Sequence, residues 1–148
     1  SQNPLLRSAL ALSGAAVPER SQSAIERPDG IVTALELSSM NLWGTQLVVL
    51  SACNSGRGYT KAGQGIYGLR RSVLIAGAET LVTSLWRVDD LVTKDLMSEY
   101  YVLLLSGVDR AAALHRAAAK IRRNYSHPYF WASFITIGRS GPLRGLRP

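Results

Sequence analysis

The chain holds a single cysteine, Cys53, which follows a short apolar segment and precedes a turn. Residues 47–50 are an unbroken run of Leu and Val, which predicts a short strand buried on both faces, as in a parallel sheet. The small and polar residues at 54–58 predict a sharp turn. Because ligands gather at the carboxyl ends of strands in open α/β sheets, a thiol just beyond this central strand is placed to act as a nucleophile. The alternative is that Cys53 is a small buried apolar residue, the ordinary role of a lone cysteine.

Length and composition indicate one domain or a large part of one. The chain has 148 residues, of which 47% are hydrophobic, enough for a core. A single cysteine excludes a disulfide framework and suits a reducing compartment. No apolar run is long enough to span a bilayer, and no signal-peptide pattern stands at the start. These features predict a cytoplasmic protein with no membrane partner.

The net charge of +7 raises the question of a nucleic-acid partner. The arginines are scattered rather than aligned in a stripe, and part of the excess lies in residues 139–148, a Gly/Pro-rich segment expected to be a flexible basic tail. We therefore expect no nucleic-acid partner. A basic nucleic-acid-binding domain stays as an alternative, and a steep salt dependence of binding would be its mark.

The order of the expected elements predicts the fold class. Strands are expected at residues 5–12, 47–50, 80–85 and the latter half of 129–138, and helices at 33–40, 65–76, 89–105 and from 109 onward. Thr33 and Glu36 have the spacing of a capping box, and Asp89 and Asp109 are expected helix caps. A solvated loop is expected at residues 15–29. This order predicts an α/β sandwich with a largely parallel sheet and helices on both faces.

Several ordered motifs carry a family resemblance. They are Ser51-Ala52-Cys53-Asn54-Ser55-Gly56, Gly65-x2-Gly68-Leu69-Arg70-Arg71, Ala76-Gly77-Ala78, Ser84-Leu85-Trp86-Arg87-Val88-Asp89-Asp90 and His127-Pro128-Tyr129-Phe130-Trp131-Ala132-Ser133-Phe134. Together with the segment from Asn3 to Leu12, they resemble the CHAT family of caspase-like domains, often attached to tetratricopeptide repeats in bacteria. The resemblance covers residues 1–138 and implies the three-layer fold of caspases, separase and metacaspases.

The resemblance also implies an activity, that of a cysteine endopeptidase acting on protein substrates. Cys53 matches the family nucleophile, whose thiolate forms an acyl-thioester after activation by a nearby imidazole. The backbone amide of Cys53, with a glycine amide beside the family histidine, would hold the oxyanion. This chemistry needs no metal or other cofactor.

This chain departs from the family in its histidine. In the family, the catalytic histidine lies in a His-Gly motif upstream of the segment that matches Asn3 to Leu12. The chain has only His115, expected inside a helix, and His127, expected in a turn with a local role. Neither follows a strand from which it could reach Cys53. We therefore expect an upstream segment to carry the catalytic histidine, whether as a second chain, a product of processing or residues before the given sequence. A catalytically inactive scaffold that binds protein partners is the alternative.

The residues after the strand at 80–85 are the expected substrate wall. Ser84-Leu85-Trp86-Arg87 resembles the Ser-Trp-Arg element of caspases, where the aromatic residue and the neighbouring backbone line the cleft. An extended peptide gains affinity there through backbone hydrogen bonds. Trp86 would be an apolar wall, with ordinary core packing as the alternative. The nearby Arg70 and Arg71 are expected to be solvated surface charges.

The sequence leaves open which type of substrate side chain is preferred at the cleavage site. Asp89 and Asp90 could supply the charge of a pocket for a basic side chain, although capping of the following helix explains the same pair. Ser51 stands where metacaspases carry an acid and supplies no charge. Arg57 and Arg87 are the candidates for a pocket that takes an acidic side chain, and a mostly apolar pocket is the third alternative.

Overall fold

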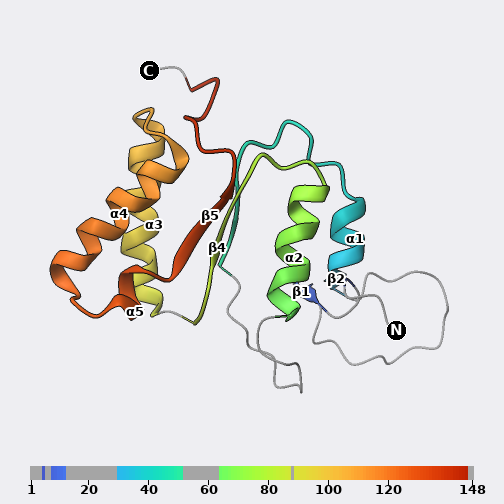
Figure 1. The fold of residues 1–148 in the computed structure, drawn as a ribbon, viewed down its shortest axis with the longest axis horizontal. Coiled ribbons are helices and arrows are strands. Elements are labelled where there is room, and N and C mark those ends of the chain that lie inside the picture. The colour runs from blue at the N-terminus through green and yellow to red at the C-terminus, as the bar shows by residue number, and fades with distance from the viewer. Residues whose placement is uncertain (1–4, 6–7, 13–29, 52–63, 88, 147–148) are drawn as a thin grey trace.

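The computed structural model describes residues 5, 8–12, 30–51, 64–87 and 89–146 (Figure 1). The described elements are β1 (Ala9–Ala11), β2 (Ile31–Thr33), α1 (Ala34–Ser39), β3 (Val48–Leu50), α2 (Gln64–Ile75), β4 (Thr80–Ser84), α3 (Asp90–Leu105), α4 (Arg110–Asn124), α5 (Pro128–Trp131) and β5 (Phe134–Gly138). None of the helices within these ranges has the length and apolar character needed to cross a membrane.

The larger sheet has the strand order β3-β4-β5, and its two pairs differ in direction. β3 is parallel to β4, whereas β5 is antiparallel to β4. β1 and β2 form a separate antiparallel pair. The described three-stranded sheet is therefore mixed: the prediction of a largely parallel sheet holds for β3 and β4 and fails for β5. The reason is visible in Figure 1: α3 and α4 run in opposite directions and return the chain to the end where β4 stopped, so β5 runs back along β4.

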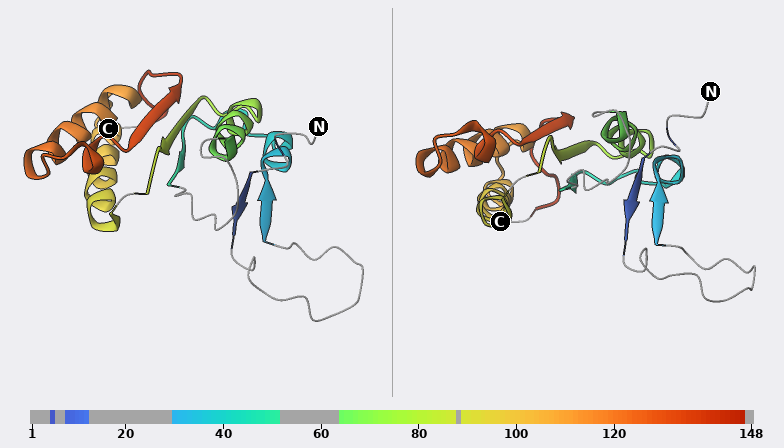
Figure 2. Two further views of the ribbon diagram at one scale, coloured as in Figure 1. Left: turned by 60° about the horizontal axis from the view of Figure 1, so that its bottom comes forward. Right: turned by 90° about the horizontal axis from the view of Figure 1, so that it is seen from below.

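Both faces of β4 are covered by helices (Figures 1 and 2). All residues of β4 are buried, and neighbouring side chains point to opposite faces of the sheet. Leu81 packs in a cluster with Leu37 of α1 and Val73 of α2. Val82 packs in a second cluster with side chains of α3 and α4, such as Leu96 and Leu114. This arrangement confirms an α/β fold with helices on both faces.

β3 differs from the expectation for residues 47–50. Its three residues are half-buried rather than buried on both faces. Among the described strands β3 pairs with β4 alone, so it lies at an edge and β4 is the central strand. Its side chains still pack on both faces, Val48 and Leu50 against the cluster that holds Leu81 and Val49 against the cluster that holds Val82. No other described strand pairs with the remaining long edge of β3.

Local signals at the helix ends are confirmed with one exception. Thr33 and Glu36 form the capping box, with the Glu36 carboxylate 2.7 Å from the Thr33 amide and the Thr33 hydroxyl 3.2 Å from the Glu36 amide. Gly77 follows α2 with a φ of 106°, a conformation that favours glycine. Asp109 occupies the N-cap position of α4, but its side chain makes no capping hydrogen bond.

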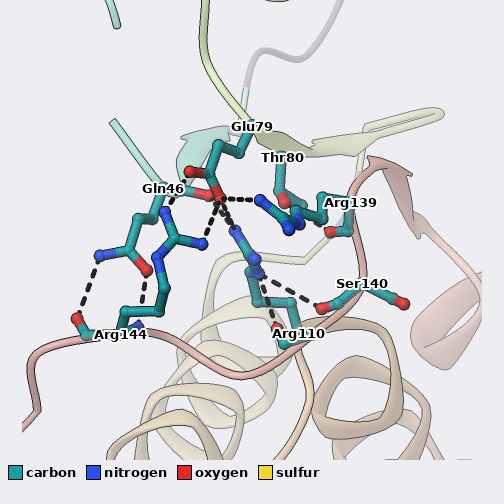
Figure 3. A network of polar contacts seen from close by, with 8 residues as sticks. Gln46, Glu79, Thr80, Arg110, Arg139, Ser140 and Arg144 are labelled. Atoms are coloured by element: carbon teal, nitrogen blue, oxygen red, sulfur yellow. Dashed lines mark hydrogen bonds and ion pairs between the residues drawn. The ribbon is translucent and has the colours of Figure 1, made fainter. Parts of the chain in front are cut away.

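A cluster of charged residues holds the end of the sheet at which β4 begins (Figure 3). Glu79 precedes β4, and its carboxylate accepts hydrogen bonds from Arg110 at 3.3 Å and from Arg144 at 3.0 Å. The Arg110 side chain is fully buried. It also donates to the carbonyls of Gln46 at 2.5 Å and Gly141 at 2.8 Å. Because a buried guanidinium is tolerated only with such partners, Arg110 ties the starts of β3, β4 and α4 to the segment after β5.

The segment after β5 is docked on this cluster. The Gln46 side chain accepts from the Arg144 amide at 2.6 Å and donates to the Arg144 carbonyl at 3.0 Å. The Thr80 hydroxyl donates to the Arg139 carbonyl at 2.6 Å. These contacts correct the expectation of a flexible tail for residues 139–146, because its arginines have a carboxylate partner: Arg139 and Arg144 both lie against Glu79. The proposed domain boundary at residue 138 stays a prediction.

The Glu79 carboxyl predicts an acid dependence of stability. Hydrogen bonds from Arg144, opposed by partial burial and aided by Arg110, lower the pKa of Glu79 from 4.5 to about 2. A lowered pKa in the folded state stabilises the fold above pH 4.5, and this stabilisation is lost as the pH falls toward 2. We expect wild-type protein to take up about one more proton on unfolding in this window than Glu79→Gln. Urea unfolding at pH 6, 4 and 2.5 measures this, and equal pH slopes for the two proteins would contradict it.

Candidate functional site

β3 and β4 end side by side, and their carboxyl ends form the lower edge of the sheet in Figure 1. This edge, made of strand ends, differs from the long edge of β3. Leu50 lies opposite Thr83 in this parallel pair, so the next residues, Ser51 and Ser84, leave the sheet at the same edge. Ser51 is exposed, and Ser84 is buried. Cys53 lies outside the described residues, so its role as the nucleophile and in the oxyanion site stays a prediction. Arg57 lies outside them too.

The segment of residues 84–87 leaves β4 at this edge, and we call it the wall segment. Its backbone is attached to the turn that precedes β5, where the Leu85 amide donates to the Ser133 carbonyl at 2.7 Å. The half-buried Trp86 donates from Nε1 to the Tyr129 carbonyl at 3.0 Å. The rings of Trp86 and Tyr129 stack with centroids 6.5 Å apart and planes 22° apart. The Tyr129 hydroxyl donates to the Arg87 carbonyl at 2.5 Å.

Trp86 therefore packs both against Tyr129 of α5 and against the core cluster that holds Val82, and it is partly exposed. Arg87 has an exposed side chain, and its carbonyl is the acceptor for Tyr129. This combination of a half-buried aromatic residue, an exposed cation and a fixed backbone provides a surface that a peptide could contact. Substrate binding by these residues stays a prediction.

The two acidic residues after the wall segment lie at the start of α3. Asp89 is the N-cap, and its Oδ1 accepts from the amides of Leu91 at 3.0 Å and Val92 at 3.1 Å. Asp90 is the exposed first residue of α3. The capping explanation thus holds for Asp89. A pocket formed by either carboxylate for a basic side chain stays a prediction.

Arg70 corrects an expectation about surface charges. It is half-buried on α2, and its Nη2 donates to the Ser84 carbonyl at 3.4 Å. Its Nε is buried without a hydrogen-bond partner among the residues that the structure describes. The neighbouring Arg71 is exposed, as expected. The reason for the difference is the position on the helix: Arg70 points toward the end of β4, and Arg71 points toward solvent.

Both histidines lie in helices or at their ends, and the residues described around them include no nucleophile that either is shown to contact. His115 is exposed on α4. His127 caps α5, where its Nδ1 accepts from the Tyr129 amide at 3.1 Å, which confirms a local role. In the described ranges, no three His, Cys, Asp or Glu side chains gather in a group that could hold a metal ion.

Comparisons with known proteins identify relatives. The family model described as the CHAT domain matches residues 1–139. Tetratricopeptide repeat protein 28 of Mus musculus is 34% identical over 110 residues, which are 73% of this chain and 4% of that protein. Its counterpart of the same name in Homo sapiens is 33% identical over 110 residues, again 73% of this chain and 4% of the relative.

The chain thus spans a small part of the curated relatives that it matches. Both relatives are mammalian, so the bacterial origin suggested by the motif resemblance has no support from them. Their name places tetratricopeptide repeats in the same proteins as the matching region. No solved structure matches the chain.

Proposed function

Because the chain belongs to the CHAT domain family, we propose that it is the carboxyl-terminal part of a caspase-like cysteine endopeptidase that acts on protein substrates. The observation that carries this proposal is the parallel pair β3–β4, which ends at one sheet edge beside the wall segment. Cys53 follows Ser51 by two residues in sequence, so a nucleophile there would lie near a surface suited to a peptide.

The proposed reaction proceeds in two steps. The Cys53 thiolate attacks the carbonyl carbon of the scissile peptide bond, and the developing oxyanion is held by the Cys53 amide and a second backbone amide. The C–N bond then breaks, and the amine leaves with a proton from the imidazolium. Water, deprotonated by the imidazole, attacks the acyl-thioester, and the C–S bond breaks to release the carboxylic acid product and restore the Cys53 thiolate and the imidazolium.

The imidazole is proposed to come from a segment upstream of this chain. Support comes from the free long edge of β3 in the described sheet, where a further strand could add its backbone hydrogen bonds. A histidine at the carboxyl end of such a parallel strand would lie at the same edge as Ser51 and Ser84. Attachment to tetratricopeptide repeats and a cytoplasmic location are parts of the same proposal.

The second candidate is a scaffold of the same fold that binds protein partners without catalysis. The name of the two relatives favours it, since that name describes repeats and no enzyme. The two candidates differ in what Cys53 does, and its reactivity therefore separates them.

Labelling by a peptidyl electrophile tests the nucleophile. In the full-length protein, Cys53→Ala is expected to lose covalent labelling completely while retaining the wild-type circular dichroism spectrum, because the attacking sulfur is gone. The control is His115→Ala, a change on the exposed face of α4, which should label like wild type. Equal labelling of Cys53→Ala and wild type would exclude Cys53, and absence of labelling in wild type would favour the scaffold.

A further inference from the structure

Two carbonyls of the wall segment are bound by side chains from opposite layers of the fold. Arg70 of α2 donates to the Ser84 carbonyl, at the start of the segment. Tyr129 of α5 donates to the Arg87 carbonyl, at its end. α2 packs on one face of β4, and α5 packs with α3 and α4 on the other. The segment is thus held at both ends by groups outside its own strand.

Tyr129 is the stronger of these attachments. Its hydroxyl lies 2.5 Å from the Arg87 carbonyl, although the side chain is 41% exposed and water is within reach. Its carbonyl accepts from the Trp86 indole at 3.0 Å, and its ring stacks on the same indole. The amide of Tyr129 is in turn fixed by His127. Three contacts therefore fix the relative positions of α5 and the wall segment.

Arg70 is the weaker attachment, since its 3.4 Å hydrogen bond is long. Its half-buried position still places a cation next to the backbone at the end of β4. The geometry predicts that loss of Arg70 affects the wall segment less than loss of the Tyr129 hydroxyl.

We propose that Tyr129, assisted by Arg70, is a positioning residue that holds the wall segment in the conformation that receives a substrate peptide. A peptide that lies along this segment needs backbone donors and acceptors at fixed places, and ordering them only upon binding would cost affinity. Tyr129 acts through the Arg87 carbonyl and the Trp86 ring and does not touch the reacting atoms. This inference rests on the proposed function for its kinetic consequence, but its structural consequence is independent of it.

The test is Tyr129→Phe, which keeps the stacked ring and removes only the hydroxyl, in the full-length protein. The hydrogen bond is of the size that changes an equilibrium about 3- to 10-fold. Hydrogen exchange of the Leu85 amide and the Trp86 indole N–H, followed by NMR, is therefore expected to become about 3- to 10-fold faster. Peptide cleavage is expected to show KM raised by a similar factor with kcat kept within about 2-fold, the pattern of lost uniform binding. Arg70→Gln should give smaller changes in the same direction.

The matched control is Tyr101→Phe, the same chemical change at a 43% exposed tyrosine on α3. It should leave the exchange rates and KM at wild-type values. Unchanged exchange of the Leu85 and Trp86 protons in Tyr129→Phe would overturn the inference, as would equal effects of the two substitutions. If wild type cleaves no peptide, the proposed function fails, while faster exchange in Tyr129→Phe would still support the positioning role.

Discussion

Arg110→Met is expected to lower the free energy of unfolding by roughly 2–3 kcal/mol, because it leaves several part-buried carbonyls without their hydrogen-bond donor. Arg110 is fully buried and donates to the Glu79 carboxylate and to the carbonyls of Gln46, Ser140 and Gly141. Methionine fills similar volume but donates no hydrogen bond. The carbonyls that Arg110 contacts would then be buried with fewer donors, at a cost that adds to the lost attraction.

Arg139→Met is the matched control for this experiment. The Arg139 guanidinium lies 3.9 Å from the same carboxylate, but its side chain is 67% exposed, so the substitution is expected to cost no more than about 0.5 kcal/mol. Urea unfolding followed by circular dichroism measures both variants. Equal losses for the two substitutions, or a loss below about 1 kcal/mol for Arg110→Met, would show that burial of the arginine does not determine how much its contacts contribute to stability.

The elements predicted best are those set by local chemistry. The capping box at Thr33, the Asp89 cap and the glycine after α2 were readable because each hydrogen bond or backbone angle involves neighbouring residues. β2 escaped prediction because it is three residues long and Thr33 is both its last residue and the helix cap. Asp109 shows the limit of such signals, since its position matches the pattern while its side chain makes no capping bond.

What the sequence could not reveal depends on contacts between distant residues. The segment after β5 looked flexible because Arg144 and its partner Glu79 are 65 residues apart. The antiparallel direction of β5 could not be predicted, because periodicity gives the type of an element and not its direction. Direction follows from α3 and α4 together, which bring the chain back to the lower edge in Figure 1.

The candidate site was predictable to the same extent. The apolar run at residues 47–50 and the turn after it predicted the position of the site at the strand ends. The motif at residues 84–87 predicted the wall segment. Tyr129 stands within one of the family motifs, but no pattern indicates that its hydroxyl reaches the Arg87 carbonyl 42 residues away. Arg70 was misjudged for a similar reason, since its acceptor on Ser84 is 14 residues away and its burial depends on how α2 packs.

Joining the proposed histidine segment to this chain is expected to convert an inactive fold into a peptidase. His115 is exposed on α4 and His127 caps α5, and we predict that neither of them activates Cys53. A positioned general base contributes about 10²- to 10⁴-fold to such reactions, and the extended protein should exceed the chain alone by at least about 100-fold in peptide cleavage. Because no other described strand covers the long edge of β3, we also expect the chain alone to self-associate and the extended protein to be monodisperse by size-exclusion chromatography.

Replacing the upstream histidine by alanine in the extended protein separates these two effects. That variant should stay monodisperse, because the added strand still covers β3, and should lose cleavage, because the base is absent. Cleavage by the chain alone that disappears in His127→Ala, with the circular dichroism spectrum unchanged, would instead make His127 the base. It would also show that the His127 contact with the Tyr129 amide opens during catalysis, because one Nδ1 atom cannot serve that amide and a thiol at once.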